Sequence, residues 1–174
     1  IQCESSPEGN RNAVAEQSLA MVLMMMNQLH VAIPEVKNFV WRRDENRGKE
    51  LFGRTVGIIG FGNTGSSFAK LLQPFNVTVL AYDKYKSDFA EGYIKEASLE
   101  QVCKYSEIIS LNVPLTDDTH HLCNMALLSS MSQRPIILNA SRGKVIHTND
   151  LMEALKQGLI SGACLDVLEN EKLD

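Results

Sequence analysis

Residues 55–65 decide the fold, and they read Thr55-Val56-Gly57-Ile58-Ile59-Gly60-Phe61-Gly62-Asn63-Thr64-Gly65. The first part is an apolar run typical of a buried strand, and the last six residues form a Gly-x-Gly-x-x-Gly turn. An apolar face at helical spacing follows, made of Gly65, Phe68, Ala69 and Leu72. Glycine-rich hexamers occur by chance in many loops, but this one joins a strand to a helix. That context predicts a turn that binds the phosphates of a dinucleotide.

Each position of this turn has a physical task. Gly60 permits the tight turn, Gly62 lets the backbone approach a pyrophosphate, and Gly65 lets the helix pack closely on the strand. The phosphates then meet free N–H groups and the positive end of the helix dipole. Asn63 and Thr64 occupy the variable positions, and we expect them to contribute to the same phosphate site.

An acidic residue follows at the spacing that such a site requires. Asp83 closes the next apolar run, 23 positions after Gly60. A carboxylate there accepts hydrogen bonds from the hydroxyls of the adenosine ribose. It would also repel a 2′-phosphate, so we favour NAD over NADP as the cofactor. Lys84 and Lys86 keep NADP open, because either cation can neutralise a phosphate.

Short apolar runs alternate with helical segments along the rest of the chain. The predicted strands are residues 55–59, 77–82, 108–111, 135–139 and 162–167. Their near-continuous Val, Ile and Leu content is typical of strands covered on both faces. Helices are predicted over residues 12–29 and 34–43, and further helices begin at Ser98, at Asn124, and at Thr148 or Asn149. This order predicts an α/β fold with a Rossmann-type, doubly wound parallel sheet, which binds ligands at the carboxyl ends of its strands.

Composition and charge exclude several classes of function. The 174 residues are one domain in size, and 44% apolar and 22% charged residues are ordinary for a soluble fold. A net charge of −4 gives no general attraction for nucleic acid. The most apolar stretch, residues 19–26, is too short to cross a membrane. We therefore expect neither a nucleic-acid nor a membrane partner.

The four cysteines are scattered, and their spacing matches neither a metal site nor a redox pair. They are Cys3, Cys103, Cys123 and Cys164. Two of them sit in apolar runs, where a thiol usually acts as a small buried hydrophobe. We expect reduced structural thiols in a cytoplasmic protein, and no metal.

A second candidate site follows the predicted strand 135–139, in the stretch Asn139-Ala140-Ser141-Arg142-Gly143. A guanidinium at a strand end can hold a carboxylate through two hydrogen bonds and polarise the neighbouring carbonyl. Taken alone, an arginine in such a loop is more often a surface ion-pair partner. Both interpretations of Arg142 are open from these residues.

Taken together, these segments resemble the D-isomer-specific 2-hydroxyacid dehydrogenases. The matching segments occur in family order at residues 6–10, 13–16, 53–60, 111–116, 139–143 and 162–167. The resemblance implies the cofactor domain of a two-domain enzyme that transfers a hydride between NAD and a small D-2-hydroxy acid or 2-keto acid. The family's substrate domain is split, so residues 1–10 and 168–174 would be crossover segments, with most of that domain outside residues 1–174.

The resemblance also assigns roles to individual residues. Arg142 matches the catalytic arginine that binds the substrate, and Glu171 matches the glutamate that pairs with the catalytic histidine. Glu169 is interpreted as a solvated acid nearby. Asp166 matches an aspartate near the nicotinamide amide, and the turn at residues 113–114 lies along the cofactor. The expected cofactor-binding residues are Gly60, Gly62, Asn63, Thr64, Gly65, Asp83, Val113, Pro114, Ala140, Ser141, Arg142 and Asp166.

The family's catalytic histidine follows the glutamate and would lie beyond Asp174. All four histidines of the chain precede Glu171. His120 and His121 are interpreted as a solvated pair, and His147 as a surface residue at a helix entrance. We therefore expect this chain to bind NAD without turning over substrate.

Two questions stay open at this stage. The alternative function is that of a dinucleotide-sensing corepressor-like protein, since some relatives of these enzymes act in that way. The family's cofactor domain commonly forms a homodimer, and the run Met21–Met26 serves either that contact or the core.

The chain departs from the family pattern at four positions: Gln17, Thr64, Asn112 and Lys172.

Overall fold

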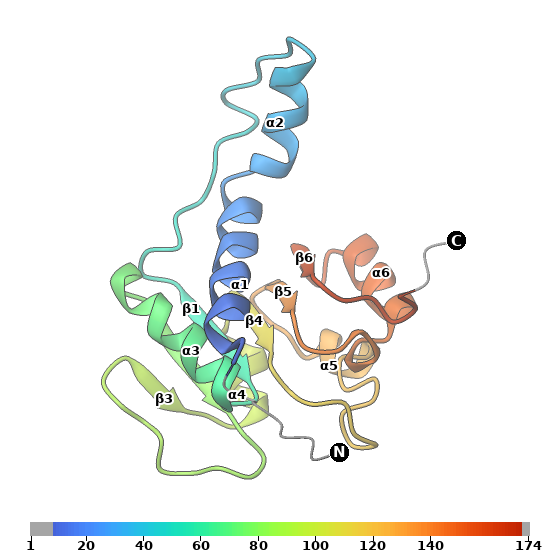
Figure 1. Cartoon of the computed structure of the whole chain (residues 1–174). Coiled ribbons are helices and arrows are strands. Elements are labelled where there is room, and N and C mark those ends of the chain that lie inside the picture. Colours follow the sequence, from blue (N-terminus) through green and yellow to red (C-terminus); the bar gives the residue numbers. More distant parts are fainter. Residues whose placement is uncertain (1–8, 172–174) are drawn as a thin grey trace, which may run out of the picture.

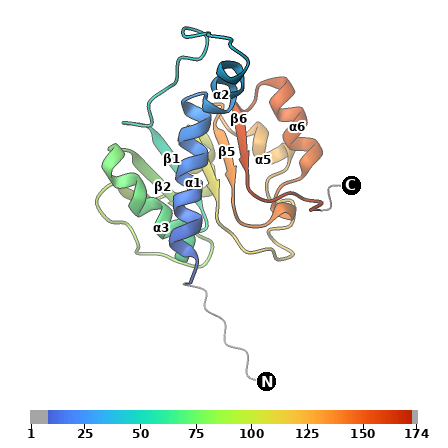
Figure 2. The same cartoon turned by 45° about the horizontal axis from the view of Figure 1, so that its top comes forward.

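The computed structural model describes residues 9–171, and within them one parallel sheet forms the centre of the domain (Figures 1 and 2). Its six strands have the order β3-β2-β1-β4-β5-β6. They are β1 (Thr55–Ile59), β2 (Thr78–Tyr82), β3 (Ile94–Glu96), β4 (Ile108–Leu111), β5 (Ile136–Asn139) and β6 (Gly162–Leu165). The strand order reverses between β1 and β4, as in a doubly wound fold. The predicted Rossmann-type architecture is confirmed.

Helices cover both faces of the sheet. They are α1 (Arg11–Met26), α2 (Leu29–Lys37), α3 (Asn63–Leu72), α4 (Leu99–Tyr105), α5 (Met125–Ser129) and α6 (Thr148–Gln157). Short 3₁₀ turns span Gln73–Phe75 and Gly143–Val145. Side chains of α1 and α3 form one core with β1 and β2, whereas α4, α5 and α6 contribute to a second core. This layering explains why the central strands are apolar on both faces.

The strand register places the first three candidate loops at one edge. Ile59, the last residue of β1, pairs with Tyr82 of β2 on one side and with Leu111 of β4 on the other. All three strands are parallel, so the chain leaves them at the same level. Gly60 and Asp83 are therefore neighbours in space although they lie 23 positions apart in sequence.

Two helix starts agree with the sequence. Ser98 and Gln101 form the predicted capping box of α4, with the two hydrogen bonds at 3.2 and 2.9 Å. Asn124 caps α5 by accepting a hydrogen bond from the N–H of Leu127 at 3.2 Å. Thr148 or Asn149 was expected to cap α6, but His147 occupies the capping position and Thr148 is already the first helical residue.

Two other expectations also require correction. The second helix spans Leu29–Lys37, so Pro34 lies inside it and not in its first turn. Gln28 adopts a left-handed conformation with φ 56° and separates this helix from α1, which ends at Met26, three residues earlier than expected. Strand β3 was missed because it is only three residues long and carries one apolar residue, Ile94, at the edge of the sheet.

Residues 27–48 form a projection, here called the arm, that leaves the domain with α2 and returns through an extended loop (Figure 1). Its two ends meet where the N–H of Lys49 donates to the carbonyl of Met26 at 2.8 Å. Helix α2 has no buried residue. Among the described residues no single helix is long and apolar enough to cross a membrane, and α1 and α2 reach that length only as a pair bent by 66°.

Candidate functional site

The glycine turn has the close packing that its sequence requires. Gly60 has φ +93°, and a Cβ there would lie 2.6 Å from the carbonyl oxygen of Asn112. A Cβ on Gly65 would lie 2.2 Å from the carbonyl oxygen of Gly60. By contrast, a Cβ on Gly62 would meet no atom within 4 Å. Two glycines therefore let the backbone pack, and the third faces open space.

This open space adjoins the start of α3. No side chain caps this helix. Because the first N–H groups of a helix have no carbonyl partner within it, they are available to an anion. The arrangement fits the pyrophosphate of a dinucleotide, with Asn63 and Thr64 in the first turn of the helix.

Asp83 is fixed by backbone groups from two loops. The N–H of Phe61, in the glycine turn, donates to Asp83 Oδ2 at 2.8 Å. The N–H groups of Tyr85 and Lys86 donate to Oδ1 at 2.9 and 3.2 Å. A carboxylate offers about four acceptor positions, so with three of them occupied this one retains about one for a ribose hydroxyl. Asp83 thus connects the turn to the end of β2 and presents a negative charge beside it.

A cavity of about 350 Å³ lies over these residues, within the size range of small-ligand sites. It brings together five residues of the expected site: Gly60, Gly62, Asp83, Val113 and Pro114. Its apolar lining includes Ile59, Tyr82, Leu99 and Leu122. The remaining expected residues line other parts of the same sheet edge, at the start of α3 and beyond β5 and β6.

The loop after β5 is organised by Asn139, a residue to which the sequence analysis gave no role. Asn139 is fully buried, and its Oδ1 accepts hydrogen bonds from the N–H and Oγ of Ser141 at 3.0 and 2.8 Å. Its Nδ2 donates to the carbonyl of Arg142 at 3.0 Å. An asparagine at the end of an otherwise apolar strand is the sequence feature that indicates such a role.

Arg142 itself is exposed at the start of the next turn. One of its guanidinium nitrogens, Nη1, donates to the carbonyl of Ser141 at 2.7 Å. Within residues 9–171 the structure shows no ion pair between Arg142 and a carboxylate, and both interpretations of this arginine stay open. The guanidinium retains donors for a ligand.

Asp166 follows β6 at the same edge. Its N–H donates to the carbonyl of Asn139 at 3.0 Å, and its Oδ1 accepts a hydrogen bond from Nε2 of Gln17 in α1. Gln17, which departs from the family pattern, therefore occupies a position where it can hold this aspartate.

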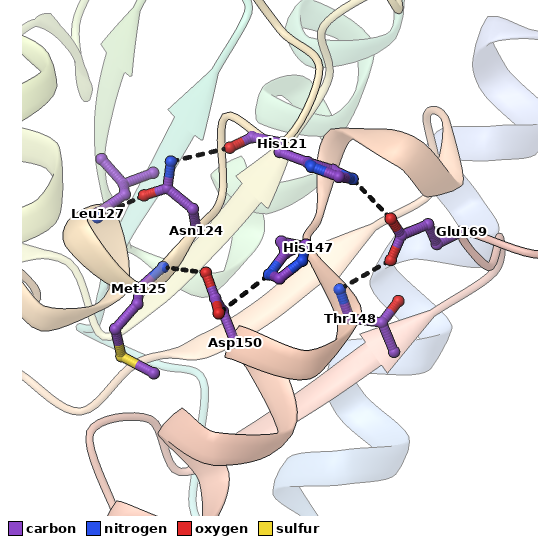
Figure 3. A network of polar contacts seen from close by, with 8 residues as sticks. All are labelled: His121, Asn124, Met125, Leu127, His147, Thr148, Asp150 and Glu169. Carbon is purple, nitrogen blue, oxygen red and sulfur yellow. Dashed lines mark hydrogen bonds and ion pairs between the residues drawn. The ribbon is translucent and has the colours of Figure 1, made fainter.

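A polar network joins the segments on either side of the Arg142 loop (Figure 3). Glu169 Oε1 lies 2.5 Å from Nε2 of His121, and Oε2 accepts the N–H of Thr148 at 2.9 Å. These hydrogen bonds, chiefly those from Thr148, lower the pKa of Glu169 to about 2. Nδ1 of His147 lies 2.9 Å from Oδ1 of Asp150.

The network corrects three predictions from the sequence. Glu169 is not a solvated acid, because it receives the first N–H of α6 and contacts His121. The ring of His121 is tilted against that of His120 and contacts the edge of His147, so His121 is part of this network and not of a freely solvated pair. His147 also belongs to the network and is not a plain surface residue.

The same segment packs tightly on the Arg142 loop. A Cβ on Gly143 would lie 1.8 Å from the carbonyl oxygen of Leu168, so only glycine fits at this contact. Glu171 comes three residues after Leu168 and is exposed. Leu168, three residues before Glu171, therefore packs against Gly143, the residue after Arg142. The role of Glu171 itself stays a prediction.

The thiols that the structure describes are buried. Cys103, Cys123 and Cys164 are buried and free, and Cys3 lies outside the described residues. Burial raises the pKa of Cys123 to about 12 and that of Cys164 to about 11, so neither is a nucleophile at neutral pH. The part of the chain that the structure describes holds no cluster of metal-ligating side chains.

Comparison with known proteins gives consistent matches. The family model for the "D-isomer specific 2-hydroxyacid dehydrogenase, NAD binding domain" matches residues 19–174. A D-specific alpha-keto acid dehydrogenase of Enterococcus faecalis is 39% identical over 160 residues, which cover 92% of this chain and 48% of that protein.

Solved structures agree with these sequence matches. The apo-structure of D-lactate dehydrogenase from Escherichia coli superposes with a TM-score of 0.88 and 32% identity, covering 96% of this chain and 53% of that one. D-lactate dehydrogenase with NAD⁺ from Lactobacillus jensenii gives a TM-score of 0.86 and 28% identity, covering 97% of this chain and 53% of that one. The chain thus spans about half the length of these three relatives.

Proposed function

The chain belongs to the D-isomer-specific 2-hydroxyacid dehydrogenase family, as its NAD-binding domain, and from this premise we propose the activity of the whole protein. It is an NAD-dependent oxidoreductase acting on a small D-2-hydroxy acid or the corresponding 2-keto acid. The observation that carries the proposal is the hydrogen bond between the glycine turn and Asp83, which lines the cavity of about 350 Å³. No observation favours the alternative of a corepressor-like sensor.

The residues of this chain have separate roles in the proposed reaction. Gly62 and the start of α3 bind the pyrophosphate, and Asp83 accepts the ribose hydroxyls. NAD, when bound, supplies the hydride chemistry. Arg142 holds the substrate carboxylate with its free donors, because a guanidinium fork matches a carboxylate.

Proton transfer requires a residue outside this chain. Glu171 would hold a protonated histidine and raise its pKa, so that the histidine donates a proton as the carbonyl is reduced. In the family this histidine follows the glutamate, so we propose that it lies beyond Asp174. We expect this chain alone to bind NAD without reducing a keto acid.

The arm supports a homodimer through this domain. Its exposed apolar side chains include Ile33, Val36, Phe39 and Trp41, and Phe39 is 99% exposed. Large exposed apolar groups of this kind mark interfaces. The Met21–Met26 run serves mainly the core, because Met26 is buried there and Met21 and Met25 pack against it. The proposed partner is therefore a second copy, bound through the arm.

The proposal also covers the cellular location of the protein and the kind of partner that it binds. Buried free thiols are typical of a reducing compartment, which supports a cytoplasmic location. The net charge of −4 supports a small-molecule partner and not a nucleic acid.

Two experiments test the proposal. The folded chain is titrated with NADH and followed by nicotinamide fluorescence, and the full-length parent is assayed with NADH against a panel of 2-keto acids. Saturable NADH binding and turnover of at least one keto acid are expected. Binding without any turnover by the parent would favour the sensor, and keto-acid reduction by this chain alone would contradict the assignment of the missing histidine.

A further inference from the structure

Two lysines follow Asp83, and both have partners in the structure. The ammonium group of Lys86 lies 3.3 Å from the carbonyl oxygen of Phe61, to which it donates. The ammonium group of Lys84 donates to Oδ2 of Asp118 at 2.7 Å. Neither cation is therefore free beside the carboxylate of Asp83.

The contact of Lys84 crosses the cofactor cavity. Lys84 belongs to the loop after β2, whereas Asp118 belongs to the loop after β4, on the other side of β1. Both side chains line the cavity that also contains Asp83 and Gly62. Hydrogen bonding and charge between the partners raise the pKa of Lys84 and lower that of Asp118. Both groups are consequently ionised over a wide range around neutral pH.

This arrangement bears on the choice between NAD and NADP. A 2′-phosphate on the adenosine ribose would lie next to Asp83, where it is repelled unless a cation compensates. Lys84 directly follows Asp83 and is the cavity-lining cation. The three charged groups Asp83, Lys84 and Asp118 carry one net negative charge, so the cavity as a whole offers a 2′-phosphate no compensation.

We propose that Asp118 is a positioning residue for cofactor selection, which holds Lys84 across the cavity and thereby withholds its ammonium group from a 2′-phosphate beside Asp83. The inference rests on the proposed function, since it assumes that this cavity takes the adenosine end of the cofactor. Asp83 repels the phosphate directly, and Asp118 prevents the adjacent lysine from relieving that repulsion.

The exposure of the pair makes the proposal testable without loss of the fold. The side chains of Lys84 and Asp118 are 54% and 63% exposed. Ion pairs this exposed contribute little to stability. Removing one partner therefore changes where Lys84 can reach, and leaves the packing of the domain intact.

The experiment compares NADH and NADPH binding to the wild-type chain and to Asp118→Ala by fluorescence titration. We expect the ratio of the NADPH to the NADH dissociation constant to fall by about fivefold, since Lys84 gains a charge-assisted contact with the phosphate. Asp117→Ala is the matched control, because it removes the same charge from the next residue, which does not line the cavity. It should leave the ratio within about twofold of wild type.

Three further measurements separate this mechanism from a general effect of charge. The double variant Lys84→Ala/Asp118→Ala should lose the gain, and Asp118→Glu should restore the wild-type ratio. The gain should also shrink as salt rises from about 0.05 to 0.5 M, because a contact between exposed charges is screened. An unchanged ratio in Asp118→Ala, or a gain that persists without Lys84, would overturn the inference. Failure of the wild type to bind NADH would instead overturn the proposed function.

Discussion

The N–H of Phe61 lies 2.8 Å from Oδ2 of Asp83, so the glycine turn and the acid at the end of β2 are directly joined. This hydrogen bond links two loops that are expected to bind different parts of one cofactor. Asp83 therefore fixes the glycine turn, and in the proposed function it would also accept a hydrogen bond from the ribose.

Asp83→Asn should weaken NADH binding by about tenfold, because the amide loses the charge and half of the acceptor capacity. Fluorescence titration measures the effect. Asp88→Asn is the control, since Asp88 lies exposed in the same loop, already has a left-handed φ of 59°, and does not line the cavity. Equal affinity in the wild type and Asp83→Asn would remove Asp83 from the site.

Two glycine substitutions in the same turn should have different effects. Gly65→Ala should destabilise the domain by about 1–3 kcal/mol, because its Cβ would lie 2.2 Å from the carbonyl oxygen of Gly60. Gly62→Ala should leave stability within about 0.5 kcal/mol of wild type and weaken NADH binding, because its Cβ enters open space that the pyrophosphate would take. Urea unfolding and NADH titration of both variants separate the two effects. Strong destabilisation by Gly62→Ala would contradict the assignment of that space to a ligand.

The features predicted well from the sequence are those encoded in short, continuous patterns. The strand before Gly60, the apolar face of α3 and the capping box at Ser98 all depend on residues within a few positions of one another. Asp83 was also found, because its distance from the turn is fixed by one helix and one strand. The alternating order of strands and helices also predicted that the loops at the carboxyl ends of the strands would lie at one edge of the sheet.

The features that were missed depend on contacts between distant loops. Glu169 and His121 are 48 positions apart, and Lys84 and Asp118 are 34 apart. Which loops meet is set by strand register and loop length, and neither is visible in the local sequence around Glu169. Asn139 was overlooked for a related reason: it ends an apolar strand, and only the folded loop shows what its buried amide holds.

Glu169 should make the stability of the domain depend on acid pH. Its pKa is lowered from 4.5 to about 2 in the folded chain, so the folded state favours the ionised form. The stabilisation is present above the unfolded value of 4.5 and is lost as the pH falls towards 2. Allowing for partial solvent exposure, the loss is about 2 kcal/mol.

Urea unfolding of the wild type and Glu169→Gln between pH 6 and about pH 2 measures this contribution. The two proteins should differ by about 2 kcal/mol at pH 6 and converge in acid, because the wild-type carboxylate is then protonated. Glu171→Gln makes the same substitution two residues away at an exposed position and should follow the wild-type curve. Parallel curves for the wild type and Glu169→Gln would show that the contacts of Glu169 with Thr148 and His121 do not stabilise the fold.

The arm should control the oligomeric state. Phe39 and Trp41 are 99% and 76% exposed, and aromatic side chains of this kind frequently dominate the binding energy of an interface. In a twofold dimer each substitution removes the contact twice, so Phe39→Asp/Trp41→Asp should raise the dimer dissociation constant by at least about 100-fold. Sedimentation velocity measures the change. Tyr105→Asp is the control, because Tyr105 is an aromatic residue 51% exposed on α4, away from the arm. A wild-type chain that stays monomeric at high micromolar concentration, or a double variant that still dimerises, would show that the arm has another partner.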